Sequence, residues 1–597
     1  MQTVSTAWVN NQKRTILEES FVELFYDITD PEAIAEASVS DNGTCYISNT
    51  QQITNNIIKT FTPYATLERN VWVLDGSRKN IPENNYKAGY VSKYICSESS
   101  SFEQIPVIEI SFAQTHTQSI PGITIIWAEE YNEYATDFKV VAYNDNEIIA
   151  EKRIIDNAST TSIVEMNIDN YNRICIEILK WCLPYHRARI TDVFVGVRKT
   201  YDKSQLVSFE YNQYVDPLSA NLPKTSINVE IDNTSDIYNP FYNEGMSKYL
   251  TPRQQIRARY GYKVDEEIEW INGGTFYLSE WEIPQNSRTA KIEARDLLEF
   301  MNATYMKGLY SSTGIDLYTL AQSVLQEANL PLNKDGSVKW TIDESLKNIY
   351  TNAALPLTTL SQCLQMIANA SQCVLYVDRD DILHIEPIGN IIKDYTIDKF
   401  NSYKKAEISL TKALERVDVT IYNNTPRETA VAIYNGTMNI NGTSSTWIKY
   451  TDPAIDVAAT VTNGTLISAQ YYTNACLLTI SGNGAVEITI TGRPLETSET
   501  IYTLSTGLTN GETQKVLNPL ITTSERAANV ADWVKNYLSN RKILSAEWRA
   551  DPRLDALDII NIQNDYGTYP MRTTSVTFTF KGAFRGESEG RLLNDMA

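Results

Sequence analysis

The alternation of apolar and polar residues predicts β-strands along most of the chain. Between Ser208 and Met301, strand-like runs such as Arg253–Tyr262 are separated by turn residues. Near the N-terminus, Thr15–Asp30 predicts a strand followed by a polar loop, and Tyr64–Ser77 predicts a further strand segment. Because unpaired strand edges are unfavourable, we expect these early strands to close one β-barrel with the strands after Ser208.

A different pattern fills the segment between Asn85 and Thr200. Short apolar or alternating runs recur about every 8 to 12 residues, with Asn, Asp and Gly between them, as in β-sandwiches. The predicted strands are Ile105–Ser111, Gly122–Trp127, Asp137–Tyr143, Glu165–Ile168, Arg173–Leu179 and Ile190–Val197. Since insertions survive at exposed turns, we interpret this segment as a sandwich or jelly roll inserted into the first barrel.

The hydrophobic period changes after Met301. Apolar residues at helical spacing predict helices over Asp316–Asn329 and Thr358–Ser371, and a strand–turn–strand hairpin follows around Asp378–Asp381. The chain then returns to a β pattern before one more predicted helix, Thr523–Leu538. Hairpin turns are predicted in this β region at Asn435-Gly436, Asn441-Gly442, Asn463-Gly464, Gly482-Asn483-Gly484 and Asn510-Gly511.

Length and composition agree with several β-rich domains. A chain of 597 residues exceeds the ~250 residues at which single cores stop growing, which predicts about three to five domains. Its 36 Tyr favour half-buried, pleated surfaces. The predicted fold class is mainly β with a smaller α+β part: β-barrel domains, an inserted jelly roll and a helix–helix–hairpin block.

Charge and cysteine content bear on partners and compartment. The chain has no run of roughly 18 apolar residues that predicts a membrane-spanning helix, and its N-terminal segment lacks the apolar core of a secretion signal. Seven irregularly spaced Cys predict reduced thiols in a protein made in a cytoplasm. A net charge of −21 disfavours a surface that grips nucleic acid, and suits either a solvated surface or a conduit whose wall repels DNA.

Several short motifs resemble the tail hub proteins, also called tail-associated or tail-tip proteins, of phages and prophages of Gram-positive bacteria. The motifs are Tyr214–Leu218 with Leu222-Pro223, Gly273–Leu278, Pro284-Gln285-Asn286, Ala294–Leu298, Ala65–Glu68, Leu74-Asp75-Gly76, Pro552–Asp558 (Pro-x-Leu-Asp-x-x-Asp) and Gly582–Gly586. This resemblance covers most of the chain.

The inserted segment separately resembles galactose-binding-like (discoidin-like) jelly rolls. The resemblance lies in Pro121–Ile125 leading to Trp127, and in Ala188-Arg189-Ile190 before a Val-Gly-Val strand. The two resemblances together imply five segments. They are 1–84 and 201–301 as two halves of a first hub barrel, 85–200 as the insert, 302–400 as an α+β hub domain, and 401–597 as a second β-rich hub domain with one helix.

Candidate catalytic groups are sparse. The three His residues lie in separate segments, and the chain contains no HExxH pair, P-loop or Gly-x-Ser-x-Gly elbow. Cys363 with His384 is the one nucleophile–base pair to consider, and packing within a helix is the simpler interpretation of Cys363. Asp378, Asp380 and Asp381 lack the register of an EF-hand calcium loop and predict a solvated turn. We therefore predict no catalytic, metal or cofactor site.

Ligand binding is best placed in the inserted jelly roll. Sugar sites combine an aromatic platform with polar side chains on loops. The candidates of these types are Trp127, Tyr131, Tyr134, Tyr185, His186 and Arg187. A core role in the sandwich is the competing interpretation for Trp127 and also for Trp181.

The hub resemblance implies a structural, non-enzymatic protein at the tail tip of a virion or a phage-tail-like particle. It implies a homotrimer that docks on the ring of distal tail protein, retains the tape-measure protein and lets the genome DNA pass without specific binding. A tail fibre or receptor-binding protein and the host cell-wall polysaccharide are further expected contacts. The alternative is a carbohydrate-binding adhesion protein acting through the jelly roll. A cell-wall hydrolase is disfavoured because little sequence follows Gly586 to form a lytic module.

Overall fold

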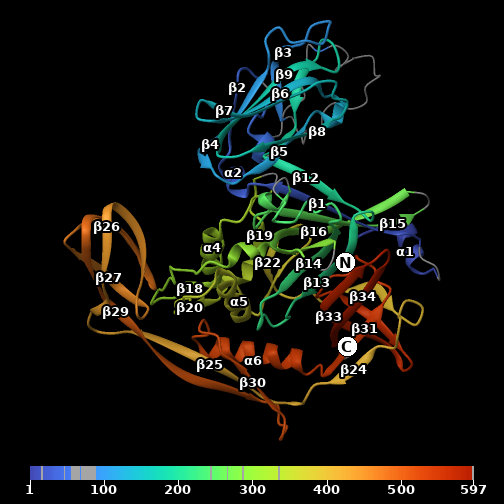
Figure 1. Cartoon of the computed structure of the whole chain (residues 1–597). Helices are drawn as coiled ribbons and strands as arrows, with labels where there is room; N and C mark the ends of the chain where they lie inside the picture. Colours follow the sequence, from blue (N-terminus) through green and yellow to red (C-terminus); the bar gives the residue numbers. More distant parts are fainter. Residues whose placement is uncertain are drawn as a thin grey trace.

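The computed structural model describes residues 1–14, 18–45, 47–55, 68, 89–242, 245–264, 267–284, 288–333 and 336–593. These residues form a mainly β, multidomain chain, which confirms the predicted fold class. Figure 1 shows four parts: a lobe (residues 30–195), a body built on one large sheet, a helical block (residues 297–388) and an arm (residues 427–494). The predicted strand Tyr64–Ser77 lies outside the described residues except for Glu68.

The body is organised around a sheet in which strands from both ends of the chain pair. Its order is β12 (Gly196–Tyr201), β1 (Ser20–Thr29), β15 (Gln255–Val264), β16 (Glu267–Glu282), β17 (Thr289–Arg295), β14 (Lys224–Asp232), β13 (Leu206–Tyr214), β33 (Gly567–Phe580), β34 (Phe584–Leu592), β31 (Lys542–Trp548) and β24 (Glu407–Leu410). Off this path, β32 (Ile559–Asn564) pairs with β33, and β23 (Ile392–Ile397) pairs with β32 in parallel. The two halves join where Phe209–Tyr214 of β13 pair antiparallel with Ser575–Phe580 of β33.

An aromatic core lies on one face of this sheet, at the join. Tyr211 stacks on Phe578 with ring centroids 4.6 Å apart. Tyr260 and Phe584 meet Phe578 edge-on, at 5.1 and 5.8 Å. Because these rings come from strands of both halves, one hydrophobic cluster spans the join. Edge-to-face and offset aromatic pairs add about 0.5–1.5 kcal/mol each beyond the area they bury.

The opposite face of the sheet is polar across the same join. Successive strands place directly opposed side chains in a row: Ser226, Asn212, Thr577, Glu587 and Glu547. Carboxylates on the same face, at half-buried or exposed positions, are Glu210, Glu230, Glu293 and Glu589. The period of two therefore gives each half of the sheet an apolar side and a hydrated side.

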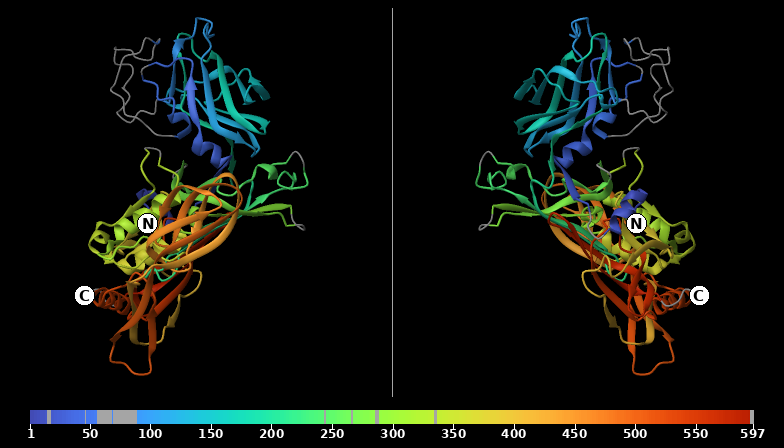
Figure 2. Two further views of the ribbon diagram at one scale, coloured as in Figure 1. Left: turned by 90° about the vertical axis from the view of Figure 1, so that its left-hand side faces the viewer. Right: turned by 90° about the vertical axis from the view of Figure 1, so that its right-hand side faces the viewer.

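The lobe is a β-sandwich that stands at one end of the molecule (Figure 2). One sheet contains β2 (Ser38–Asp41), β4 (Val107–His116), β9 (Tyr171–Trp181), β6 (Ala135–Asn144) and β7 (Glu147–Ile154). The other contains β11 (Asp192–Phe194), β5 (Ile120–Ile126) and β8 (Thr161–Ile168), and β3 (Tyr90–Ile95) pairs with β10 (Arg187–Ile190). The short helical segments α2 (Pro31–Glu36), α3 (Gln52–Asn55) and η1 (Glu129–Tyr131) complete it.

The sandwich takes in residues earlier than the start predicted for it at residue 85. Strand β2 pairs with β4 of the lobe, and the hydrophobic cluster of the lobe begins at Ala33. The chain enters the lobe after β1 and leaves it into β12, and these two strands pair antiparallel in the body. The predicted pairing of the first strand with strands after Ser208 is confirmed by β1 and β15.

The helical block confirms the predicted helices and hairpin. It contains η3 (Leu297–Met301), β18 (Ile315–Asp316), α4 (Leu317–Ala328), β19 (Trp340–Ile342), η4 (Glu344–Asn348), β20 (Tyr350–Thr351), α5 (Leu360–Ser371), β21 (Val374–Val377) and β22 (Leu383–Glu386). Helix α5 begins with a capping box between Thr359 and Gln362. The third predicted helix is α6 (Ser524–Leu538), capped by Thr523 and packed in the same hydrophobic cluster. No helix of the described residues is long and apolar enough to span a membrane.

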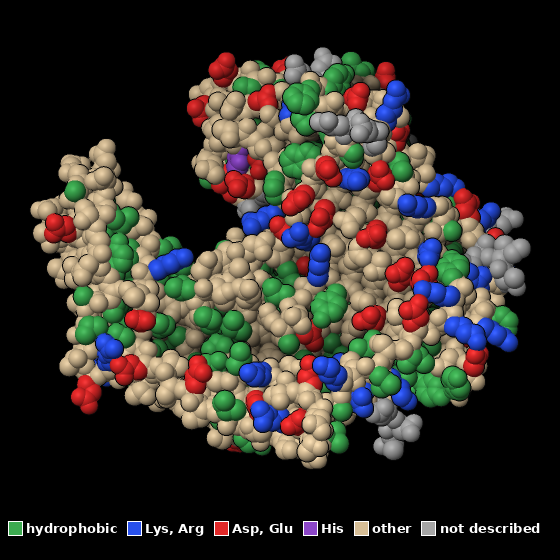
Figure 3. Space-filling model, turned by 60° about the horizontal axis from the view of Figure 1, so that its bottom comes forward, with side chains coloured by type: hydrophobic (Ala, Val, Ile, Leu, Met, Phe, Trp, Pro, Cys, Tyr) green, Lys and Arg blue, Asp and Glu red, His purple; other side chains and the backbone are tan. Residues whose placement is uncertain are grey.

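The arm is a sheet centred on the long strand β29 (Ala475–Ser505). Its first part pairs with β26 (Val431–Lys449), β27 (Ala454–Thr462) and β28 (Thr465–Tyr471), while its last part pairs with β25 (Leu414–Pro426), which also pairs with β30 (Glu512–Val516). Figure 3 shows the arm standing clear of the lobe, with open space between them on that face. The short elements α1 (Thr6–Gln12) and η2 (Ser247–Tyr249) belong to the body side of the chain.

Three of the predicted hairpin turns are wrong. Asn435-Gly436 and Asn441-Gly442 lie inside β26, and Gly482-Asn483-Gly484 lies inside β29. Asn441 pairs with Asn483 across the two strands, and Gly442 and Gly484 have φ of 83° and 110°. The glycines therefore change the local conformation of continuous strands instead of reversing the chain. The turns at Asn463-Gly464 and Asn510-Gly511 are confirmed, since each lies between strands.

Candidate functional site

The hairpin turn between β21 and β22 is buried, which corrects the prediction of a solvated acidic turn. Arg379 is 8% exposed and Asp381 is 3% exposed. Asp381 has a left-handed φ of 64°, and the Asp378 carboxylate accepts a hydrogen bond from the N–H of Ile382 at 2.9 Å. These local contacts close the turn while the two short strands point it into the body.

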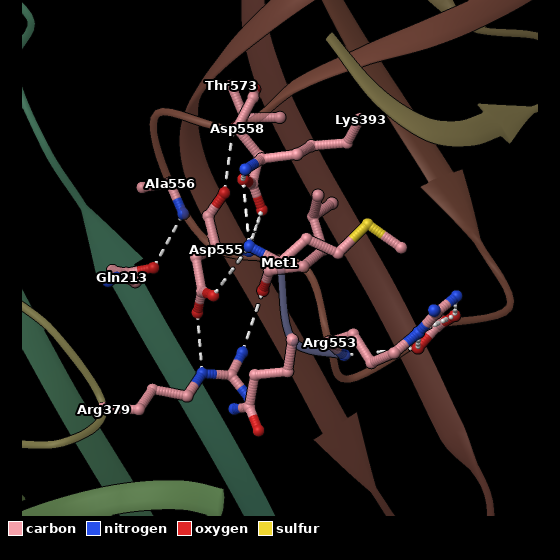
Figure 4. A network of polar contacts seen from close by, with 12 residues as sticks. Met1, Gln213, Arg379, Lys393, Arg553, Asp555, Ala556, Asp558 and Thr573 are labelled. Atoms are coloured by element: carbon pink, nitrogen blue, oxygen red, sulfur yellow. Dashed lines mark hydrogen bonds and ion pairs between the residues drawn. The ribbon is translucent and has the colours of Figure 1, made fainter. Parts of the chain in front are cut away.

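Arg379 ties the helical block to both halves of the body. Its guanidinium donates to Asp555 Oδ1 at 2.6 Å, to the carbonyls of Pro552 and Leu554 at 2.6 and 2.9 Å, and to the Asn272 carbonyl at 3.3 Å. Figure 4 shows this guanidinium reaching the loop that carries Asp555. Asn272 lies on β16, so one side chain from the hairpin joins the first half, the second half and the helical block. A planar guanidinium with five donors suits such a multiple contact.

The loop that receives Arg379 is the Pro552–Asp558 motif singled out in the sequence. Arg553 donates to Asp551 through Nε at 2.9 Å and Nη2 at 2.5 Å, and both side chains are buried. The N–H of Ala556 donates to Gln213 Oε1 at 2.7 Å, which fixes the loop against β13. The loop is thus held rigidly before Arg379 contacts it.

Asp555 and Asp558 form the acidic side of this network (Figure 4). Asp558 accepts from the N–H of Asp555 at 3.0 Å, and the α-amino group of Met1 lies 2.9 Å from Asp558 and 3.5 Å from Asp555. Burial raises the pKa of Asp558, and the Met1 ammonium group acts in the opposite direction. The carboxylates are therefore matched by cations on two sides.

A second buried carboxylate of the turn contacts the first half of the body. Asp381 accepts from Tyr277 Oη at 2.6 Å and pairs with Lys339 Nζ at 2.5 Å. Burial raises the pKa of Asp381, although the ammonium group of Lys339 opposes the shift. Close to this pair lies Asp296, whose carboxylate caps η3 through the N–H of Leu298 at 3.0 Å.

Asp296 gives the junction a testable pH dependence. Burial raises its pKa from 3.8 to about 7, the Asp381 charge adds to the shift, and the Leu298 and Thr225 donors oppose it. Between these two pKa values the folded chain holds a proton that the unfolded chain has lost. The free energy of unfolding therefore falls as pH rises through this window and levels off above about pH 7.

We expect Asp296→Asn to stabilise the chain at pH 8 but not at pH 4. Asn caps a helical turn as well as Asp does, and it cannot ionise. The gain at pH 8 relative to pH 4 should be about 2 kcal/mol, below the ~4 kcal/mol that three full pKa units would give. Urea unfolding of both proteins across this pH range measures it, and parallel curves would contradict the assignment.

A cavity of 420 Å³ opens beside the network. It is lined by residues of both signs of charge, including Gln213, Tyr376, Asp378, Arg379, Glu386, Lys393, Asp555 and Asp558. Among the described residues, no group of three or more His, Cys, Asp or Glu side chains is arranged to hold a metal ion. The geometry is that of a brace between structural units.

The considered pair Cys363 and His384 has other roles. Cys363 is fully buried, and burial raises the pKa of its thiol to about 12, so the thiolate is not formed at neutral pH. The ring nitrogens of His384 lie 2.8 Å from Asp378 and 2.9 Å from Thr341 Oγ1, and the ring stacks on Tyr376. Cys363 is therefore a packing residue.

Two of the candidate sugar-binding residues lie in the core of the lobe. Trp127 is 0% exposed, and its ring centroid is 6.0 Å from that of Trp181. His186 is 6% exposed with Nδ1 3.0 Å from Glu133, which also accepts from Trp181 Nε1 at 2.9 Å. Neither Trp127 nor His186 presents a face to a ligand, so a platform role for them is wrong. Glu133, which holds both rings, carries no signal in the sequence.

The other four candidates are only partly accessible. Tyr131 and Tyr134 pack partly against the lobe core, and the Arg189 guanidinium lies 5.0 Å from the Tyr131 ring centroid. The Arg187 guanidinium donates to the Ser92 carbonyl at 3.0 Å. Tyr185 is 38% exposed. The structure thus leaves Tyr185 as the most accessible ring of the set.

Comparison with known proteins gives distant similarities. No protein-family model and no curated protein matches the chain. Among solved structures, it is similar to the tail protein from Neisseria meningitidis MC58, with a TM-score of 0.37, 11% identity, and coverage of 66% of this chain and 93% of that one. It is also similar to the 43 kDa tail protein of prophage MuSo2 from Shewanella oneidensis (TM-score 0.36, 11% identity, 66% and 96% coverage).

A third similar structure is the prophage tail protein gp18 from Listeria monocytogenes EGD-e. It has a TM-score of 0.36 and 8% identity, with 67% of this chain and 92% of that chain covered. At TM-scores below 0.4, the function proposed next rests on the sequence and geometry of the chain itself.

Proposed function

We propose that this chain is a structural protein of a phage tail or a phage-tail-like particle, a hub that forms part of the wall of the tail tube near its tip. The carrying observation is the single sheet that runs through both halves of the body, with an aromatic core on one face and a polar row on the other. The motifs quoted from the sequence support the same role, and two of them, Tyr214–Leu218 and Pro552–Asp558, lie at the junction of the body.

The arrangement of the body suits a ring assembly. Each chain contributes two sheet halves side by side, so that three copies would supply six halves around one axis. A closed ring reuses one contact and leaves no free end. Six halves would match a hexameric ring of distal tail protein, which is the partner that the hub resemblance implies.

The polar face suits the wall of a conduit for DNA. Glu547 and Glu587 lie directly opposite each other on neighbouring strands, and the chain as a whole carries a net charge of −21. Carboxylates facing a channel repel DNA phosphates and prevent the duplex from binding to the wall. The aromatic core and the Arg379 brace would hold this face rigid as a tape-measure protein and DNA pass.

Mass measurement and imaging of the purified full chain test the proposal. We expect a particle of about three times the 67.5 kDa chain mass by mass photometry, and end-on electron-microscopy classes with six similar lobes around a central hole. A monomer at all concentrations up to tens of micromolar, with no ring in the presence of a distal tail protein, would overturn it. Omitting the distal tail protein is the control for rings that need this partner.

A further inference from the structure

The edge strand β24 leaves an apolar stripe uncovered at one end of the body sheet. Within the described residues, β24 pairs only with β31, so its other edge is open. Ile408 and Leu410 alternate along this strand and are 49% and 67% exposed. Natural sheets seldom leave an open edge with large apolar side chains, because such an edge pairs with other chains.

The stripe lies on the core side of the sheet. Ile408 is directly opposite Leu544, and Leu410 is directly opposite Lys542. Directly opposed residues of antiparallel strands point to the same face, and Leu544 and its neighbour in that row, Ala546, are 0% and 1% exposed. The apolar face of the second half therefore continues past the end of its own core.

Further exposed aromatic residues lie next to this edge. Phe400, Tyr403 and Tyr566 are 71%, 54% and 86% exposed. The pairing of Lys405 with Asp565 at 2.5 Å brings the turn that carries Tyr566 to the segment that leads into β24. We call Phe400–Leu410 with Tyr566 the β24 edge.

The charges around the β24 edge are mainly positive. Lys404 and Lys405 precede the strand, Lys412 follows it, and Arg541 and Lys542 flank it on β31 and the loop before it. Arg541 donates to the Thr411 carbonyl at 3.0 Å, which places it at the end of the strand. A basic rim in a chain with 73 Asp and Glu against 52 Lys and Arg is complementary to another copy of the same chain.

We propose that the β24 edge is the docking surface for a second copy of the chain. The second copy covers Ile408 and Leu410 with apolar side chains, occupies the open strand edge, and meets the basic rim with carboxylates. The contact is heterologous, because an acidic surface of one copy meets the basic edge of the next, and a closed ring of such contacts leaves no free edge. This inference rests on the proposed function, and it names the surface through which the ring assembles.

The test compares the full chain with the double variant Ile408→Glu, Leu410→Glu. We expect the variant to have the mass of one chain at a concentration where the original chain has the mass of three, a shift of at least tenfold in the concentration needed for assembly. The matched control is Ile501→Glu, Leu508→Glu, because these side chains are 67% and 53% exposed on another part of the chain. The control should assemble as the original chain does.

The outcomes separate this inference from the proposed function. Assembly of the β24 variant with unchanged mass would overturn the inference and leave the hub proposal standing. A monomeric original chain would overturn both. Thermal unfolding within about 3 °C of the original chain shows that the variant is folded, because both substituted side chains are exposed in the isolated chain. As a second measurement, Lys412→Glu with Lys542→Glu should also weaken assembly and should make it less sensitive to salt.

Discussion

Replacing Arg379 with Ala should lower the free energy of unfolding by about 3–5 kcal/mol, the usual cost of removing one partner from a buried ion pair. The substitution leaves Asp555 without its cation and leaves the carbonyls of Pro552 and Leu554 without their donor. Urea unfolding followed by tryptophan fluorescence measures the loss. Trp548, which is buried in the second half of the body, reports on the part of the chain that loses its brace.

The matched control is Arg585→Ala. Arg585 also pairs with a carboxylate, Glu547, but its side chain is 56% exposed. Exposed pairs contribute about 0–1 kcal/mol, so this variant should unfold close to the original chain. In a double-mutant cycle, Arg379→Ala with Asp555→Asn should cost less than the sum of the single changes. Equal costs for Arg379→Ala and Arg585→Ala would refute the role of Arg379 as a brace.

Phe578→Ala should also cost about 3–5 kcal/mol, for a reason independent of charge. The substitution opens a cavity at the join between the two halves, where Phe578 contacts Tyr211, Tyr260 and Phe584. Large-to-small changes in a core lose both the buried area and the contacts around the cavity. Phe578→Leu fills most of the space and should cost less than half as much.

Tyr566→Ala is the control for loss of an aromatic ring in the same half. Tyr566 is 86% exposed, so its removal should change the free energy of unfolding by no more than about 0.5 kcal/mol. Chemical unfolding at one pH compares the three variants. An equal cost for Phe578→Ala and Tyr566→Ala would show that the join between the halves is not closed by the aromatic cluster.

Local patterns predict much of the secondary structure because they act over a few residues. The helical spacing and caps of α4, α5 and α6 are visible in the sequence, as is the alternation that gives β13 its two faces. The Asn-Gly pairs inside β26 and β29 mislead, since an Asn-Gly pair predicts a turn only where no neighbouring strand continues the ladder. That neighbour is set by residues some 40 positions away, beyond the reach of a local pattern.

The site was harder to predict because it depends on contacts between distant segments. Asp378–Asp381 has the composition of a solvated turn, and only the approach of Asn272 and Asp555 buries it. The Pro552–Asp558 motif was noted, but its partner was not. Trp127 illustrates the opposite case: an aromatic residue after a buried strand suits both a core and a sugar platform, and its 0% exposure decides for the core.

The pairing of β1 with β12 has a consequence for how this molecule can be altered. Thr29, the last residue of β1, is the register partner of Gly196, the first residue of β12. The chain therefore leaves and re-enters the body at a single rung, and the whole lobe occupies the place of a hairpin loop. A different sandwich, or a turn of a few residues, fits between these two positions without changing one pair of the ladder, so the lobe is an exchangeable cassette on a constant frame.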